Sequence, residues 1–141
     1  MTTTAHVDTF ARDNLPPREL WPELIFDVPE VRYPERMNCA AELLDRQVAS
    51  GHGDRPAIWA PGPDGQPAFA TYRQLLARAN QIAHVLRDDL RLPTGTRVLL
   101  RGPNNPMMAA CWYAVMKAGC IAVATMPLLR ARELKDRTSV V

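Results

Sequence analysis

The strongest pattern along the chain is an apolar stripe with the period of an amphipathic helix, over residues 72–90. The stripe consists of Leu75, Ala79, Ile82 and Leu86. Steps of three and four residues place these side chains on one face, and mostly polar residues fill the others. Thr71 is a suitable N-cap for this helix. A second helix is predicted over residues 39–49, with Asn38 as its N-cap.

Shorter apolar segments around these helices predict strands. Residues 56–60 and 68–72 flank a turn rich in proline and glycine, which is typical of a β-hairpin. Residues 97–100 form a short continuous apolar strand of the kind found in parallel sheets. Asn105 and Pro106 then suit the N-cap and the first position of another helix.

An apolar run over residues 107–129 contains a single charge, Lys117, and is long enough to suggest a membrane span. A lysine near the midpoint costs about 2.5–3.5 kcal/mol on the insertion scale, which argues against a span. Gly119 divides the run, because helix-forming residues precede it and β-branched residues follow it as far as Pro127. The run is therefore interpreted as a helix that ends at Gly119 and a buried strand over residues 121–125, and no membrane partner is predicted.

Strand, helix and strand over residues 98–125 make a βαβ unit, which predicts an α/β fold with parallel strands and a right-handed crossover. Three regions are expected along the chain. Residues 1–37, interrupted by prolines, form an irregular N-terminal arm that wraps over a domain surface. Residues 38–136 form the domain itself, and residues 137–141 form a short tail.

Charge and cysteine content narrow the function classes. The 141 residues carry a net charge of +2, with basic residues spread along the chain, so no nucleic-acid partner is predicted. Cys39, Cys111 and Cys120 are odd in number, lack a CxxC motif and lie among apolar residues. Free buried thiols in a reducing compartment are expected, and a metal site is not. The N-terminus lacks the pattern of a secretory signal, so the expected location is the cytoplasm.

The loop that follows the strand at residues 97–100 is the first place to look for chemistry, because open α/β folds often bind ligands there. Residues 101–106, RGPNNP, contain one glycine and two prolines, and prolines lack the N–H groups that a phosphate cradle needs. This loop is interpreted as the start of a helix. His84 is expected on a helix surface, and the sequence ties no nucleophile to His6 or His52. No catalytic, cofactor-binding or metal-binding residue is therefore predicted.

Four segments occur in a characteristic order: DRPAI (54–58), TYRQLLARANQIAHVL (71–86), TGTRVLLRGPNNP (94–106) and VMKAGCIAVATMPLLRARELK (115–135). Together they resemble the beginning of an AMP-forming acyl- or aryl-CoA ligase of the adenylate-forming superfamily. The motifs TY-x-x-L and KAG, in this order and at this spacing, are moderately specific. The segment NLPPRELWPELIFDVPEVRYPERMNCAAELLD (14–45) resembles the benzoate and 2-aminobenzoate CoA ligase branch.

The resemblance implies that residues 38–136 are a partial N-terminal subdomain, an incomplete portion of the large adenylating domain. In the family both motifs are structural, and the phosphate loop, the ribose-binding Asp and the catalytic Lys come later in the chain. None of these is found here, so no functional residue is carried over. Intact members use ATP, Mg²⁺ and CoA, whereas no cofactor is expected for this chain alone. Residues 137–141 diverge from the family, which indicates a truncated ligase.

Two classes of function remain open. In the first, the chain is a fragment of a ligase whose intact relatives activate an aromatic carboxylate with ATP and transfer it to CoA, and alone the fragment is inactive. In the second, the chain is a non-catalytic interaction module or half of a split ligase. Its partner would be the missing remainder of the ligase or another copy of the chain, bound through uncovered sheet surfaces.

Overall fold

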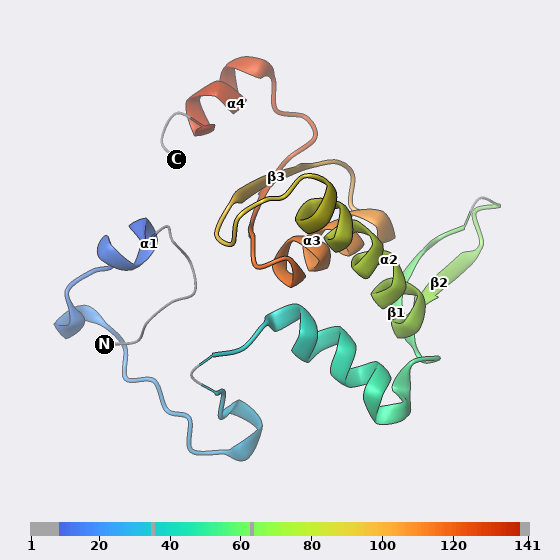
Figure 1. Ribbon diagram of the computed structural model, residues 1–141, viewed down its shortest axis with the longest axis horizontal. Coiled ribbons are helices and arrows are strands. Elements are labelled where there is room, and N and C mark those ends of the chain that lie inside the picture. The colour runs from blue at the N-terminus through green and yellow to red at the C-terminus, as the bar shows by residue number, and fades with distance from the viewer. Residues whose placement is uncertain (1–8, 35, 63, 139–141) are drawn as a thin grey trace.

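The computed structural model describes residues 9–34, 36–62 and 64–138 (Figure 1). The first elements are α1 (Phe10–Asp13), η1 (Arg18–Leu20) and η2 (Pro29–Val31). The body follows with η3 (Ala41–Asp45), η4 (Val48–His52), β1 (Pro56–Pro61), β2 (Pro67–Thr71), α2 (Tyr72–His84), η5 (Val85–Asp89), β3 (Arg97–Arg101), α3 (Pro106–Lys117), β4 (Ile121–Thr125) and α4 (Ala131–Thr138). This mixture of helices and short sheets confirms the predicted α/β class.

Helix α2 begins where the sequence predicts, at a capping box. The Thr71 hydroxyl accepts a hydrogen bond from the Gln74 N–H at 3.2 Å, and the Gln74 side chain accepts one from the Thr71 N–H at 2.9 Å. The predicted stripe faces the core. Its buried members are Leu75, Ala79 and Leu86. The helix predicted over residues 72–90 is thus confirmed, with one difference: its last part, η5, is wound as a π-helix.

The core lies where α2 packs against α3 and the helical run of η3 and η4 (Figure 1). Small side chains let α2 and α3 approach closely; they are Ala79, Ala83, Ala110 and Ala114. Leu44 of η3 is 1% exposed and completes this cluster. A second buried cluster joins η5, α3 and β3, and consists of Leu86, Leu100, Val115 and Cys120. Two adjoining clusters therefore hold the described body together.

The strands form two separate pairs in the described part of the chain. Strands β1 and β2 are antiparallel, and Trp59 lies opposite Phe69 with ring centroids 5.2 Å apart. Strands β3 and β4 are parallel, and Leu99 lies opposite Val123. Helix α3 connects β3 to β4, so both the predicted hairpin and the predicted βαβ unit are confirmed.

The apolar run over residues 107–129 is divided as expected. Helix α3 occupies its first part, Gly119 has a left-handed φ of 74°, and β4 follows. No helix among the described residues is long and apolar enough to cross a membrane. A left-handed residue at this position allows the chain to leave the helix without the steric cost that a Cβ atom would add.

The described part of the N-terminal arm presents large apolar side chains to solvent. They include Leu15, Leu20, Trp21, Leu24, Ile25, Phe26 and Val28. The Trp21 indole N–H donates to the Pro16 carbonyl at 2.8 Å, so the arm makes its own local contacts. That the arm wraps over a domain surface stays a prediction, as do the three expected regions of the chain.

Candidate functional site

The loop after β3 is built as the start of helix α3. The Asn105 side-chain oxygen accepts a hydrogen bond from the Met108 N–H at 2.9 Å, and Pro106 occupies the first turn. Capping therefore uses one of the N–H groups that could otherwise contact an anion, and Pro103 and Pro106 have none to offer. The structure thus confirms that this loop begins a helix, and the absence of a phosphate site in it stays a prediction.

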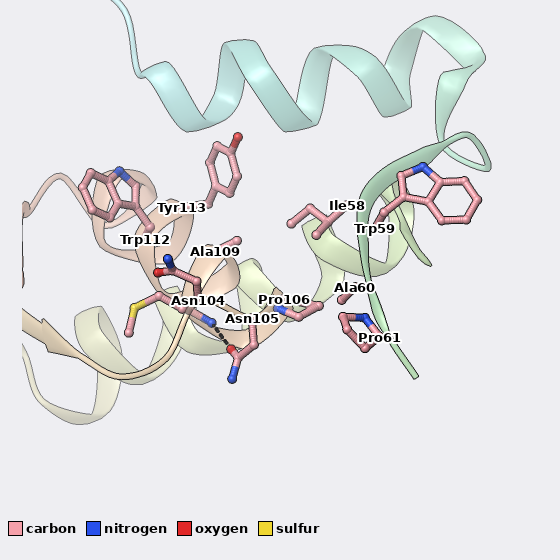
Figure 2. A pocket seen from close by; sticks show the side chains of 11 residues that line it. Ile58, Trp59, Ala60, Pro61, Asn104, Asn105, Pro106, Ala109, Trp112 and Tyr113 are labelled. Carbon is pink, nitrogen blue, oxygen red and sulfur yellow. Dashed lines mark hydrogen bonds between the residues drawn. The ribbon is translucent and has the colours of Figure 1, made fainter. Parts of the chain in front are cut away.

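An open groove of about 510 Å³ lies between β1 and the first turns of α3 (Figure 2). Ile58 points into it from β1, while the ring of Trp59 points away from Ile58 (Figure 2). Asn104, Ala109 and Tyr113 line the opposite side. The described lining contains no carboxylate, imidazole, thiol, ammonium or guanidinium group. Such a lining suits apolar packing, and it offers no nucleophile or general base at neutral pH.

Lys117 of the KAG motif forms an ion pair that connects distant parts of the chain. Its Nζ lies 2.6 Å from both carboxylate oxygens of Asp45 in η3, and its side chain is only 15% exposed. Nearby, the Asn38 amide donates to the Met116 carbonyl at 2.8 Å. The Asn38 oxygen also accepts from the N–H groups of Ala40 and Ala41, which confirms its predicted capping role. These contacts bind the first long helical run to the C-terminal end of α3.

Sequence reasoning missed Asp45 as the partner of Lys117. The sequence placed Lys117 only at the end of a helix, and Asp45 lies 72 positions earlier on another helix. No local pattern relates two positions that become neighbours only when η3 packs against α3. The pair holds two helices together, so the motif has a structural role in this chain.

Gly119 of the same motif sits against the turn that precedes β3. The Gly119 carbonyl accepts a hydrogen bond from the Gly95 N–H at 2.8 Å. A Cβ atom on Gly119 would lie 3.2 Å from Cγ2 of Thr94, and the φ of 74° would strain any larger residue. Glycine is thus required by both the conformation and the close neighbour.

Two further segments of the family-like pattern also contact each other. The Arg73 guanidinium of the TY-x-x-L motif donates to the Asp54 carboxylate at 3.0 Å. This hydrogen bond lowers the pKa of Asp54 and raises that of Arg73, and the opposite charges act in the same direction. Both side chains are exposed, so solvent screens the pair.

The histidines provide no catalytic arrangement among the described residues. His84 is exposed on α2, as predicted. His52 is half-buried and shares a hydrogen bond with the Gln47 side chain at 3.1 Å. His6 lies outside the described residues. In the described ranges, no group of three or more His, Cys, Asp and Glu side chains could hold a metal ion.

The cysteines differ from one another more than expected. All three are free, but Cys39 is exposed, so the prediction that it is buried is wrong. Ala40 and Leu44, four residues apart, form the buried face of this helical run, and Cys39 falls outside that face. Cys120 is buried, and burial raises the pKa of its thiol.

Alkylation should therefore distinguish these thiols. With iodoacetamide at pH 8, we expect Cys39 of the folded chain to react at least 100-fold faster than Cys120, because only an accessible thiolate is nucleophilic. Peptide mass spectrometry measures both rates. In 8 M urea the two rates should converge. Equal rates in the folded protein would contradict the burial of Cys120.

Comparisons with known proteins agree with this architecture. The profile described as AMP-binding enzyme matches residues 44–140. The chain is 36% identical to the acetyl-coenzyme A synthetase of Mycobacterium tuberculosis strain H37Rv in an alignment of 102 residues that covers 68% of this chain and 16% of that protein. It is 32% identical to the long-chain-fatty-acid–CoA ligase of Salmonella typhimurium over 111 residues. That alignment covers 79% of this chain and 19% of the ligase.

Solved structures give the same result. The crystal structure of CmiS6 superposes with a TM-score of 0.65 and 32% identity over 77% of this chain and 28% of that chain. The anthranilate CoA ligase AuaEII, crystallised with anthranoyl-AMP, gives a TM-score of 0.59 and 26% identity. The match covers 70% of this chain and 18% of AuaEII. This chain thus spans less than a fifth of the length of the two curated relatives and corresponds to their N-terminal-domain fold. The profile match over residues 44–140 places the chain in the AMP-binding enzyme family.

Proposed function

We propose that the chain is the N-terminal portion of an AMP-forming aryl-CoA ligase of the benzoate and 2-aminobenzoate type. The complete enzyme would activate an aromatic carboxylate with ATP and transfer the acyl group to CoA. The observation that carries the proposal is the family match over residues 44–140, since the family's members include acyl-CoA ligases. The likeness to AuaEII and the arm over residues 14–45 support the aromatic substrate class.

In this proposal the chain supplies part of the scaffold and none of the catalytic groups. Its family motifs are occupied by structural contacts: Lys117 with Asp45, and Arg73 with Asp54. The loop over residues 102–105 caps a helix. Adenylation by the complete enzyme would therefore depend on residues beyond position 141. The proposed location is the cytoplasm, because free and exposed Cys39 suits a reducing compartment.

The nucleotide sequence downstream of codon 141 tests the truncation. We expect a neighbouring or shifted reading frame to encode a Ser/Thr/Gly-rich phosphate loop and the rest of the adenylating domain. If no downstream frame encodes it, the proposal of a truncated ligase fails and a dedicated small protein takes its place.

The substrate class is tested on the protein made by joining the two frames. We expect pyrophosphate release with 2-aminobenzoate or benzoate to exceed that with acetate or palmitate by at least tenfold in kcat/KM. Acetate and palmitate are the matched controls, since the curated relatives include an acetyl-coenzyme A synthetase and a long-chain-fatty-acid–CoA ligase. A preference for either control acid would contradict the aromatic assignment.

A further inference from the structure

Strand β3 has an open edge. Within the described residues it pairs with β4 alone, on one side, so no strand meets the backbone groups on its other side. An edge of this kind is a template for a further strand. The exposed residues of β3 are Arg97, Leu99 and Arg101, and they share one face. Val98 and Leu100 point to the other face and pack with the second buried cluster.

Arginine at both ends distinguishes β3 from the other described strands. The strands β1, β2 and β4 contain no charged residue. Charged side chains on an edge strand oppose indiscriminate pairing, because a neighbouring strand without opposite charges would take their water away. A strand that suits this edge therefore carries two acidic residues four positions apart, with apolar residues between them.

The N-terminal arm contains a segment with this pattern. Residues 23–27 read ELIFD, so two carboxylates flank three apolar residues. All five residues are exposed, and Ile25 is 66% exposed. In an extended chain Glu23, Ile25 and Asp27 point to the same side. That side then reads acid, apolar, acid, which is the complement of the exposed face of β3.

The arm segment already has the conformation that strand addition needs. Trp21 before it has φ −77° and ψ 144°, and Val28 after it has φ −90° and ψ 142°. Residues 22–27 belong to no helix or strand, so no element has to unfold before they pair. Pro22 and Pro29 lack N–H groups, which limits any pairing to the residues between them.

The two patterns fit in one register. With Ile25 opposite Leu99, a carboxylate lies opposite each guanidinium, about 13 Å apart at the rise of a strand. The fit is the same for parallel and antiparallel directions, because both patterns are symmetric about their centres. A slip of one residue would move the carboxylates to the opposite face of the sheet and lose both charge pairs.

The position of the arm indicates which molecule it serves. Asn38, where the arm joins the body, is held at the C-terminal end of α3 by its hydrogen bond to the Met116 carbonyl. From there the arm stands apart from the body, and residues 23–27 do not reach β3 of their own chain (Figure 1). A second copy can therefore receive the arm without a change in either fold. Under two-fold symmetry each copy donates one arm and accepts one.

We propose that two copies of this chain exchange arms, so that residues 23–27 of each copy add a strand to the β3 edge of the other. A carboxylate of the arm then lies opposite each arginine of the strand. The inference goes beyond the proposed function, since it concerns association of the 141-residue chain and involves no substrate.

A charge swap tests the proposal, with sedimentation velocity of the purified 141-residue chain as the measurement. The arm variant carries Glu23→Arg and Asp27→Arg, and the strand variant carries Arg97→Glu and Arg101→Glu. We expect the wild type to dimerise and each variant alone to have a dissociation constant at least tenfold higher, because like charges then face each other. An equimolar mixture of the two variants should form a heterodimer, since each arm again meets opposite charges.

A second variant leaves the body unchanged, because Arg101 also donates to two carbonyls of the loop after β4. Ile25→Asp should raise the dissociation constant at least tenfold. Leu20→Asp is the matched control, since Leu20 is 74% exposed in the same arm but lies outside the segment, and it should dimerise as the wild type does. Hydrogen exchange over residues 97–101 should be at least tenfold slower in the wild type than in Ile25→Asp.

Three results would overturn the proposal: a wild type that stays monomeric at millimolar concentration, equal dimerisation by the wild type and Ile25→Asp, or no heterodimer in the mixture of charge variants. A monomer whose β3 amides are protected by its own arm would assign the edge to the same chain and exclude the exchange. The substrate preference of the complete enzyme is measured separately, so failure here leaves the proposed function standing.

Discussion

Replacing Leu44 by alanine is expected to lower the free energy of unfolding by about 2–5 kcal/mol. Leu44 is 1% exposed and is one of the two largest fully buried side chains in the described structure. It shares a buried cluster with Ala79 and Ala114 of the close α2–α3 pair, and their methyl groups are too short to fill a cavity left by its removal. Truncation removes apolar burial and leaves a void that rigid helices cannot close.

The neighbouring Leu43 supplies a matched control for this prediction. Leu43 is 51% exposed on the same helical segment, and Leu43→Ala should change the unfolding free energy by no more than about 0.5 kcal/mol. Urea unfolding followed by tryptophan fluorescence measures both variants, with the slope of the transition confirming that each remains two-state. Equal effects of the two substitutions would show that η3 does not pack on α2 and α3 as described.

Removing the carboxylate of Asp45 is expected to destabilise the fold by about 1–2 kcal/mol, because it leaves the Lys117 ammonium 15% exposed and without its partner. This loss of stability is at the low end of the range for removing the partner of a charged group, because Asp45 is itself 45% exposed and solvent screens the pair. Lys117→Met should cost less than Asp45→Ala, because methionine keeps most of the apolar stem and leaves no buried charge.

A double-mutant cycle measures the pair itself. Asp45→Ala combined with Lys117→Met should be less destabilising than the sum of the single variants, because the second change removes the stranded ammonium. The exposed pair of Arg87 and Asp88 is the control, and Asp88→Ala should give no measurable change in the urea midpoint. Strict additivity at Asp45 and Lys117 would mean that the two groups do not interact.

Elements with local signals were predictable from the sequence. Thr71 and Gln74 carry the whole capping box that begins α2, and Asn105 with Pro106 carries the start of α3. Gly119 separates helix from strand because glycine, which has no Cβ atom, readily adopts the left-handed φ of 74° that ends the helix. In each case the cause lies within four residues of the effect, so a pattern along the chain was sufficient.

Features made by packing were not predictable in the same way. Asp45 and Lys117 meet only through the contact of two helices, and the groove beside Ile58 exists only because the hairpin lies next to α3. Cys39 was expected to be buried from its apolar neighbours, but the next residue, Ala40, is the buried one and Cys39 is exposed. An apolar neighbourhood in sequence does not specify which face of a helix a side chain occupies.

We propose that this chain forms part of the scaffold of an adenylating enzyme and contributes none of its catalytic groups. Pyrophosphate release by the purified 141-residue chain, with ATP, Mg²⁺, CoA and either 2-aminobenzoate or benzoate, tests it most directly. Far-UV circular dichroism first establishes that the sample is folded. We expect a rate equal to that of the blank without protein. Turnover above that blank would contradict the claim, because it would place a functioning adenylation site within these residues.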